Sequence, residues 1–529
     1  MSTVYLAITL GPIKKTMGMA RKTREFWAAS MLFSLLAKAL CDQLKKAGTK
    51  KEEFLVPHPS VFDHEIKDVG LYLDRIICKV PGKEFIDQFE ETIVKPALGE
   101  LCKEVNLVAD SNFSVADLQS YFKIHALCLL AEDAKPLQEI SKHLNTLELF
   151  SKESSISGVS GKIKQFLENV NTEYDDSNHP LQSTFLDRYL KLPDFNGNNR
   201  IPSIVEVTTI QIQRNEAACK KYKDILNKYI WKKSPEENKL FPELKKEFNE
   251  DIRNYHKYFC ILQADGDHLG TTLLESNSKS IYEISSDLIT WGKTALQMLK
   301  NYGALPIYIG GDDLLCFAPV HNGQESILDL AFKLNSTYNQ MSNLLSKELT
   351  LRVGIKISYY KSPMFEAYEE SLKLLNKASE SRNSCCINLE KHSGQPHHFC
   401  FSFKEEYSHY IKPLFDSMTG DKKDKNFLTS IIYKIAENEE LFSIISHDYN
   451  RVWAFCQNQF EETKEKSGQP VYPEKYAFLV GVAKYLVYLF QQNKTNKDEG
   501  SKMYVATFQL YSILKSIRFI KGLDDDKDE

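Results

Sequence analysis

Two acidic motifs stand at the ends of apolar segments in the middle of the chain. Gly310-Gly311-Asp312-Asp313 lies between the apolar runs 305–309 and 314–317, which are typical of the two strands of a hairpin. Asp265-Gly266-Asp267 follows another strand-like run, 258–264. Adjacent carboxylates at the ends of buried strands repel one another unless a cation lies between them. Divalent metals held by carboxylates serve phosphate chemistry, so the motifs predict a metal-dependent phosphate site.

The elements around the motifs predict that the two motifs meet. Apolar residues at three- and four-residue spacing indicate helices, and β-rich runs indicate further strands. The helices are expected at 281–301, 325–347 and 363–381, and the further strands at 349–359, 385–389 and 398–403. This order is the ferredoxin-like βαββαβ pattern, in which the first strand lies beside the hairpin. We therefore expect Asp265, Asp312 and Asp313 to form one catalytic metal site. Asp267 is a further candidate ligand, with plain solvation at a strand end as the alternative.

The N-terminus carries a second motif. A strand-like run at 5–10 is followed by Gly11-Pro12 and by a helix that reads A-R-K-T-R-x-x-W-x-x-S over 20–30. Together with the GGDD turn, this motif resembles the large polymerase-like subunit of type III CRISPR effector complexes, in its Cmr (type III-B) version. Its GGDD domain is similar to the palm, or cyclase, domain of nucleotidyl polymerases. The resemblance implies two palm domains, of which the first lacks metal ligands, and a cytoplasmic complex with other subunits, guide RNA and target RNA.

The resemblance also implies an activity. Such a subunit is a target-RNA-activated nucleotidyltransferase (EC 2.7.7-like) of antiviral defence, which uses Mg²⁺ or Mn²⁺ to join ATP into cyclic oligoadenylate, a second messenger. The nucleotide-binding residues that we expect are Gly266, Gly310, Gly311, Lys377, Ser379, Arg382, Arg21 and Arg24. Relatives have a lysine where this chain has Ser379, so Lys377 or Arg382 would replace it. For Arg21 and Arg24, a solvated helix start is the alternative. Two other functions stay open: AMP transfer from ATP to a small acceptor such as S-adenosylmethionine, and a catalytically silent scaffold.

Composition sets limits on the other classes of function. The net charge of −4 means that nucleic-acid contacts depend on local basic patches. The 11 cysteines include no C-x-x-C pair, so we expect free thiols and no zinc site, although relatives often hold four cysteines around zinc. No segment approaches the roughly 20 apolar residues of a membrane span. A Walker ATPase is unsupported, since Gly158-x-x-Gly161-Lys162 has the wrong spacing.

The fold class that we expect is α+β and multidomain, with two ferredoxin-like palm domains, a helical insert and a C-terminal helical domain. In the first domain, strands are expected at 5–10, 55–57, 75–80 and 121–130, with a long helix ending near residue 46. The chain begins at the first palm, so we expect no HD nuclease domain, and a lone His447-Asp448 pair cannot supply one. The predicted domains are an N-terminal palm-like domain (1–160), a mainly helical linker (161–251), the GGDD palm (252–405) and a C-terminal helical domain (406–529).

Overall fold

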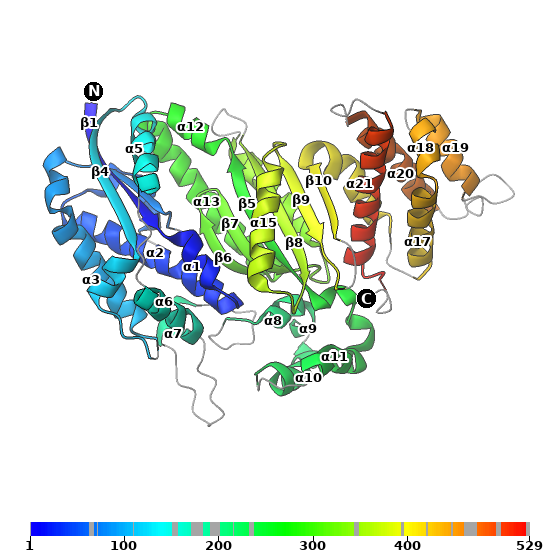
Figure 1. Cartoon of the computed structure of the whole chain (residues 1–529), viewed down its shortest axis with the longest axis horizontal. Helices are drawn as coiled ribbons and strands as arrows, with labels where there is room; N and C mark the ends of the chain where they lie inside the picture. Colours follow the sequence, from blue (N-terminus) through cyan, green and yellow to red (C-terminus); the bar gives the residue numbers. More distant parts are fainter. Residues whose placement is uncertain are drawn as a thin grey trace.

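Two β-sheets, with helices packed between and around them, make up the body of the protein (Figure 1). The computed structural model describes residues 2–62, 68–70, 72–108, 110–150, 157–170, 184–190, 201–214, 216–231, 237–342, 349–392, 396–418, 422–445, 448–459, 473–492 and 499–524. His447 lies outside these residues. The predicted α+β class with two ferredoxin-like units is confirmed by the strand orders of the two sheets.

The first sheet is built from the N-terminal part of the chain. Its strands are β1 (Ser2–Gly11), β2 (Phe54–Val56), β3 (Arg75–Lys79) and β4 (Lys123–Glu132). They lie in the order β2-β3-β1-β4, with β1 antiparallel to both of its neighbours. This is the ferredoxin-like order, and its strands occur where the apolar runs predict them. One face of the sheet is covered by α2 (Thr23–Lys46), the helix that carries the N-terminal motif.

The second sheet contains both acidic motifs. Its strands are β5 (Tyr258–Asp267), β6 (Leu305–Gly310), β7 (Asp313–Pro319), β8 (Thr350–Tyr359), β9 (Ser384–Leu389) and β10 (His397–Ser402). Their order is β10-β9-β8-β5-β7-β6, so β5 lies directly beside the β6–β7 hairpin. The helices α13 (Ser278–Tyr302), α14 (Ile327–Ser342) and α15 (Met364–Ala378) connect the strands. The predicted βαββαβ order is confirmed, and β9 and β10 extend the sheet beyond β8.

Alternation along β5 decides which way each acidic-motif residue faces. Cys260 and Leu262 belong to the core under α13 and α14, while Phe259 and Ile261 belong to the core that the second sheet shares with α2. Phe26 of α2 packs edge-on against Phe317 of β7, with ring centroids 5.4 Å apart. Since side chains alternate along a strand, odd-numbered positions of β5 face the first sheet and even-numbered positions face α13 and α14.

The remaining described segments are mainly helical. They comprise α1 (Ile13–Met19), α3 (Lys95–Val105), α4 (Val115–Tyr121), α5 (Pro136–Phe150), α6 (Ser157–Asn169), α7 (Thr184–Tyr189), α8 (Ile204–Thr208), α9 (Ile210–Gln213), α10 (Glu216–Leu226), α11 (Leu240–Phe248), α12 (Leu269–Glu275), α16 (Lys412–Asp416), α17 (Lys422–Glu437), α18 (Glu439–Ile445), α19 (Tyr449–Gln459), α20 (Pro473–Gln492) and α21 (Glu499–Ile520). The helix α21 packs on β10 at the far end of the second sheet (Figure 1). No helix among the described residues has the length and apolar character needed to cross a bilayer.

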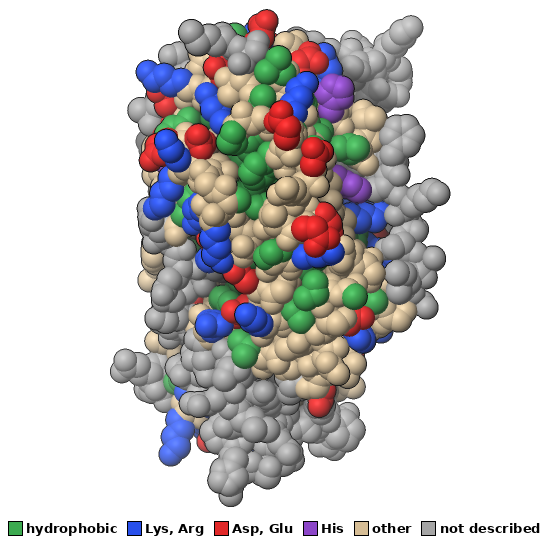
Figure 2. Space-filling view, turned by 90° about the vertical axis from the view of Figure 1, so that its left-hand side faces the viewer, with side chains coloured by type: hydrophobic (Ala, Val, Ile, Leu, Met, Phe, Trp, Pro, Cys, Tyr) green, Lys and Arg blue, Asp and Glu red, His purple; other side chains and the backbone are tan. Residues whose placement is uncertain are grey.

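The surface and the cysteines bear on two of the compositional predictions. On the face of the molecule in Figure 2, basic and acidic side chains are interspersed, with hydrophobic ones between them.

The prediction that all cysteines are free thiols is wrong for two of them. Cys386 of β9 and Cys400 of β10 form a disulfide because the antiparallel register places them directly opposite each other. The register of two strands joined by a loop cannot be read from cysteine spacing.

Candidate active site

The three predicted catalytic carboxylates come together at one edge of the second sheet. Asp265 lies near the end of β5, Asp313 begins β7, and Asp312 lies in the turn before it. Pairing of Ala264 with Leu314 holds β5 and β7 in the register that brings them together. The carboxyl groups of Asp312 and Asp313 both lie within hydrogen-bonding distance of Asp265. The predicted meeting of the two motifs is therefore present in the structure.

Burial raises the pKa of Asp312 and of Asp313, and neighbouring carboxylates raise both further. The pKa of Asp312 is raised to about 7, first by burial and then by the charge of Asp265. The pKa of Asp313 is raised well above its usual value by burial, then by Asp312 and Asp265. Asp313 lines a cavity and is exposed there, and Asp312 next to it is half-buried. The cavity walls nevertheless remove much of their hydration, and the raised pKa values follow from that loss. Uncompensated carboxylates at this density are typical of a cation-binding site.

Asp267 has a different environment from the other three. Its side chain is 3% exposed and accepts hydrogen bonds from the Thr350 hydroxyl (2.8 Å) and the Asn383 backbone N–H (2.9 Å). Arg352 of β8 lies opposite Asp265 in the register and binds both Asp265 and Asp267. These contacts occupy the Asp267 carboxylate, so the structure supports neither of its predicted roles, metal ligand or solvated strand end.

The donor set at this edge fits a hard divalent cation. Among the described residues, no three Asp, Glu, His or Cys side chains are already arranged so that they could hold a metal ion together. Asp265 has Arg352 as its counter-charge, whereas burial and then Asp265 raise the pKa of Asp312, and burial and then Asp312 and Asp265 raise that of Asp313. Asp312 and Asp313, together with the Asp265 carboxylate that Arg352 already binds, supply the oxygen ligands that Mg²⁺ and Mn²⁺ prefer.

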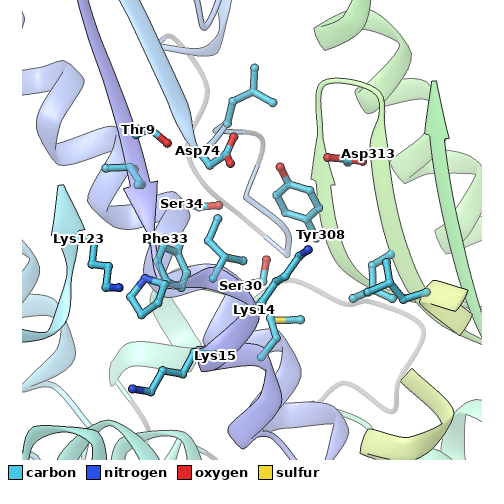
Figure 3. A pocket seen from close by; sticks show the side chains of 18 of the residues that line it. Thr9, Lys14, Lys15, Ser30, Phe33, Ser34, Asp74, Lys123, Tyr308 and Asp313 are labelled. Carbon is cyan, nitrogen blue, oxygen red and sulfur yellow. The ribbon is translucent and has the colours of Figure 1, made fainter. Parts of the chain in front are cut away.

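A cavity of about 710 Å³ lies between the two sheets and reaches the carboxylates. Asp265 and Asp313 line it from the second sheet, and Asp74, which immediately precedes β3, lines it from the first. In Figure 3, Asp74 and Asp313 lie on opposite sides of the Tyr308 ring. Asp74 also contributes to the raised pKa of Asp313, so the two carboxylates are near neighbours. The cavity volume suits a nucleotide-sized ligand.

Three lysines line the same cavity from the first-sheet side. Lys14 and Lys15 belong to α1, and Lys123 begins β4 (Figure 3). Carboxylates at one side of a cavity and lysines at the other can hold a metal-bound polyphosphate, because the lysines neutralise phosphate oxygens beyond the metal's reach. Lys14 and Lys15 stand in a basic cluster that is visible in the sequence. No sequence pattern singles out Lys123 or Asp74.

The N-terminal motif contributes both structure and a cavity residue. Thr23 donates a hydrogen bond to the Pro202 carbonyl (2.6 Å), and the indole N–H of Trp27 donates to the Asp68 carbonyl (2.6 Å). Ser30, the last residue of the motif, lines the cavity and is 6% exposed. Its hydroxyl has no hydrogen-bond partner among the described residues. The sequence did not single out Ser30, although the motif contains it.

Five predicted nucleotide-binding residues do not line this cavity. The Arg21 guanidinium donates to the Gly18 and Ala20 carbonyls at the end of α1 and lies over the Phe365 ring. The Ser379 hydroxyl donates to the Asn376 carbonyl. The other residues of this group are Arg24, Lys377 and Arg382, of which Arg382 lines a separate cavity near β10. These five residues therefore have no part in the function that we propose for the cavity.

The glycines of the GGDD turn allow the two sheet domains to approach. Gly311 has a φ of +64°, and a β-carbon there would lie 3.0 Å from Cδ2 of Leu73. Leu73 adjoins Asp74, so the residue that contacts the turn also positions the first domain's carboxylate at the cavity. Gly310 lies next to it, where a β-carbon would meet the Tyr308 hydroxyl. The structure gives Gly310 and Gly311 a steric role in the turn, while their predicted nucleotide contact remains a prediction.

Comparison with known proteins gives two matching families. The family Cas10/Cmr2, second palm domain, matches residues 258–386, and the family CRISPR-associated protein Cmr2, N-terminal, matches residues 5–125. The CRISPR system Cmr subunit Cmr2 of Pyrococcus furiosus is 27% identical over 176 residues, which cover 27% of this chain and 20% of that protein. The match therefore spans only a fifth of that relative's length.

Solved structures share the fold. A type III-B Cmr-beta structure in the apo state aligns with a TM-score of 0.59 at 12% identity, over 92% of this chain and 82% of that one. Cmr-beta bound to cognate target RNA aligns at 0.58 and 12% identity, over 92% and 83%. A Csm1–Csm4 cassette in complex with AMPPNP aligns at 0.52 and 12% identity, over 90% and 69%. At this identity the likeness establishes the fold alone.

Proposed function

Because the Cas10/Cmr2 second palm domain matches residues 258–386 and the Cmr2 N-terminal family matches residues 5–125, we propose that this chain is a nucleotidyltransferase of CRISPR antiviral defence. It uses ATP to make a nucleotide second messenger of the cyclic oligoadenylate kind, within a type III-B ribonucleoprotein complex. One observation carries the proposal: the Asp265, Asp312 and Asp313 carboxylates converge beside a cavity whose other side presents lysines. A scaffold would gain nothing from carboxylates whose pKa is raised by burial and by neighbouring carboxylates, because the ionised cluster destabilises the fold.

The proposed roles follow from the position of each side chain. Asp265, Asp312 and Asp313 would hold Mg²⁺ or Mn²⁺, which supplies charge neutralisation and activation of an attacking hydroxyl when bound. Lys14, Lys15 and Lys123 neutralise the triphosphate, and the walls of the cavity orient the nucleotide. In the transfer, an acceptor oxygen forms a bond to the α-phosphorus of ATP, pyrophosphate leaves, and the acceptor hydroxyl loses its proton.

The structural neighbours support nucleotide and RNA partners for this fold. Csm1–Csm4 cassettes have been solved in complex with AMPPNP, with pppApA and with cA4, and Cmr-beta with cognate target RNA. We propose by analogy that this chain binds ATP, works with other subunits and guide RNA, and responds to target RNA. The cytoplasm is the compartment in which such a complex would meet its target.

One observation favours a second candidate, AMP transfer to a small acceptor such as S-adenosylmethionine. Among the described residues that line the cavity, all three lysines come from the first-sheet side. Lys377, Ser379 and Arg382, which were expected to bind nucleotide, all lie off the cavity wall. A single transfer needs only one group of lysines to bind one triphosphate. Synthesis of an oligoadenylate needs ATP bound at both the donor and the acceptor position.

The test is a labelling assay on the assembled complex. We expect target RNA, Mg²⁺ and α-³²P-ATP to give a labelled product with the wild type and none with Asp312→Ala and Asp313→Ala combined. Asp224→Asn, an exposed carboxylate on α10, is the matched control and should leave the yield unchanged. Addition of S-adenosylmethionine identifies the acceptor by the mass of the product. Absence of any product from the wild type, or undiminished product from the double variant, would overturn the proposal.

A further inference from the structure

A tyrosine hydroxyl lies buried and unpartnered beneath the carboxylates. Tyr338 of α14 has no exposed surface, and its hydroxyl has no hydrogen-bond partner among the residues that the structure describes. Buried hydroxyls normally have a partner, because leaving one unsatisfied costs roughly 1–3 kcal/mol. The mechanism proposed above does not use Tyr338. Its position therefore needs a reason other than packing.

The hydroxyl and the Asp312 carboxylate flank the same small space, which Gly266 leaves open. A β-carbon at Gly266 would lie 2.3 Å from the Tyr338 hydroxyl and 2.7 Å from Oδ2 of Asp312. Gly266 occupies an even-numbered position of β5, so it faces α14 while its neighbour Asp265 faces the cavity. Any larger residue would separate the hydroxyl from the carboxylate. The lack of room for a β-carbon explains why the central residue of the Asp-Gly-Asp motif is a glycine.

The Tyr338 ring has little freedom to turn away. It packs edge-on against Trp291 of α13, with ring centroids 5.1 Å apart and an interplanar angle of 81°. Both rings belong to the fully buried core under the second sheet. A rigid aromatic anchor of this kind presents its hydroxyl at a fixed point, as residues that orient metal ligands commonly do.

We propose that Tyr338 is a positioning residue for Asp312: once a cation is bound, the hydroxyl, which has no partner among the described residues, donates a hydrogen bond to the Asp312 carboxylate. The proposal rests on the metal role assigned above. The hydroxyl stabilises and orients the carboxylate from behind, on the side away from the cavity. Loss of an outer partner of a metal ligand typically weakens metal binding by 10–100-fold. Tyr338 therefore affects the metal without touching it.

The test compares two buried tyrosines of the same core. Tyr302 of α13 is equally buried, but its hydroxyl donates to the Pro319 carbonyl (3.1 Å), away from the carboxylates. Tyr338→Phe and Tyr302→Phe are titrated with Mn²⁺ as full chains, with bound metal followed by electron paramagnetic resonance. Melting temperature is measured in EDTA for each variant.

We expect the two variants to show opposite effects. Tyr338→Phe should raise the Kd for Mn²⁺ by at least about tenfold and leave the melting temperature unchanged or slightly higher, because it removes an unsatisfied hydroxyl. Tyr302→Phe should lower the melting temperature and leave the Kd unchanged. An unchanged Kd in Tyr338→Phe, or equal weakening in both variants, overturns the positioning role. If the wild type binds no Mn²⁺, the metal role in the proposed function fails as well, so the two failures are distinguishable.

Discussion

Replacing Asp312 by asparagine should stabilise the protein when no metal is present. The pKa of Asp312 rises from 3.8 to about 7 in the folded chain, so ionising the folded carboxyl is costly. A shift of this size corresponds to at most roughly 4 kcal/mol at a pH above 7. The amide has its own desolvation cost, and we expect Asp312→Asn to gain about 1–2 kcal/mol. For an unfolding unit of about 150 residues, the size of the predicted GGDD palm, that is a rise of about 2–8 °C in melting temperature.

The sign of the pH dependence follows from the direction of the shift. A carboxyl with a raised folded pKa binds more protons in the folded chain than in the unfolded chain between about pH 4 and pH 7. Wild-type stability therefore falls as the pH rises through this window. Asp312→Asn lacks this contribution. The difference in unfolding free energy between the variant and the wild type should therefore be near zero at pH 4 and largest above pH 7.

The assay is thermal unfolding in EDTA at several pH values, with Asp329→Asn as the control. Asp329 is the opposite case: the Ser326 backbone N–H and hydroxyl donate to its carboxylate, and these bonds and Lys412 lower its pKa. Asp329→Asn should lose about 0.3–1 kcal/mol, because the amide lacks the negative charge that interacts with the N-terminus of α14 and with Lys412. Added Mn²⁺ should then stabilise the wild type but not Asp312→Asn. If Asp312→Asn melts lower than the wild type at pH 8 in EDTA, the account of the carboxylate cluster is wrong.

Three other substitutions test separate parts of the structure. Lys123→Ala should weaken binding of a fluorescent ATP analogue about tenfold, measured by anisotropy. An unchanged affinity would show that Lys123 does not bind the triphosphate. Gly311→Ala should lower the unfolding free energy by about 1 kcal/mol, because alanine disfavours the positive φ at this position, and its methyl group should crowd Leu73. We expect a lower melting temperature and a lower product yield. Wild-type values of both would contradict the close approach of the turn to the first domain. Trp27→Phe should cost about 1–3 kcal/mol in unfolding free energy by leaving the buried Asp68 carbonyl without its donor; a loss below about 0.5 kcal/mol would refute the role of that bond.

The sheet and its central carboxylates could be predicted because their signals are local. Apolar periodicity located β5 and the β6–β7 hairpin, and the ferredoxin-like order then required Asp265 to lie beside Asp312 and Asp313. Neither step depends on contacts between distant side chains. The same reasoning located the first sheet, whose strands are also marked by apolar runs.

The site residues that could not be predicted from the sequence are placed by pairing and packing between distant segments. Arg352 lies opposite Asp265 only because β8 pairs with β5 in one register, and that pairing also engages Asp267. Lys123 and Asp74 reach the cavity because the first sheet packs across α2 from the second. A basic or acidic residue at the end of a strand gives no sign of the domain that it will face.

The most direct test of the proposed site is a structure of the chain with Mn²⁺ and a non-hydrolysable ATP analogue, with the metal located by its anomalous scattering. The account predicts manganese peaks among the carboxylates of Asp265, Asp312 and Asp313, with the triphosphate extending toward Lys14 and Lys123. A nucleotide bound in another cavity, or manganese away from these carboxylates, would contradict it.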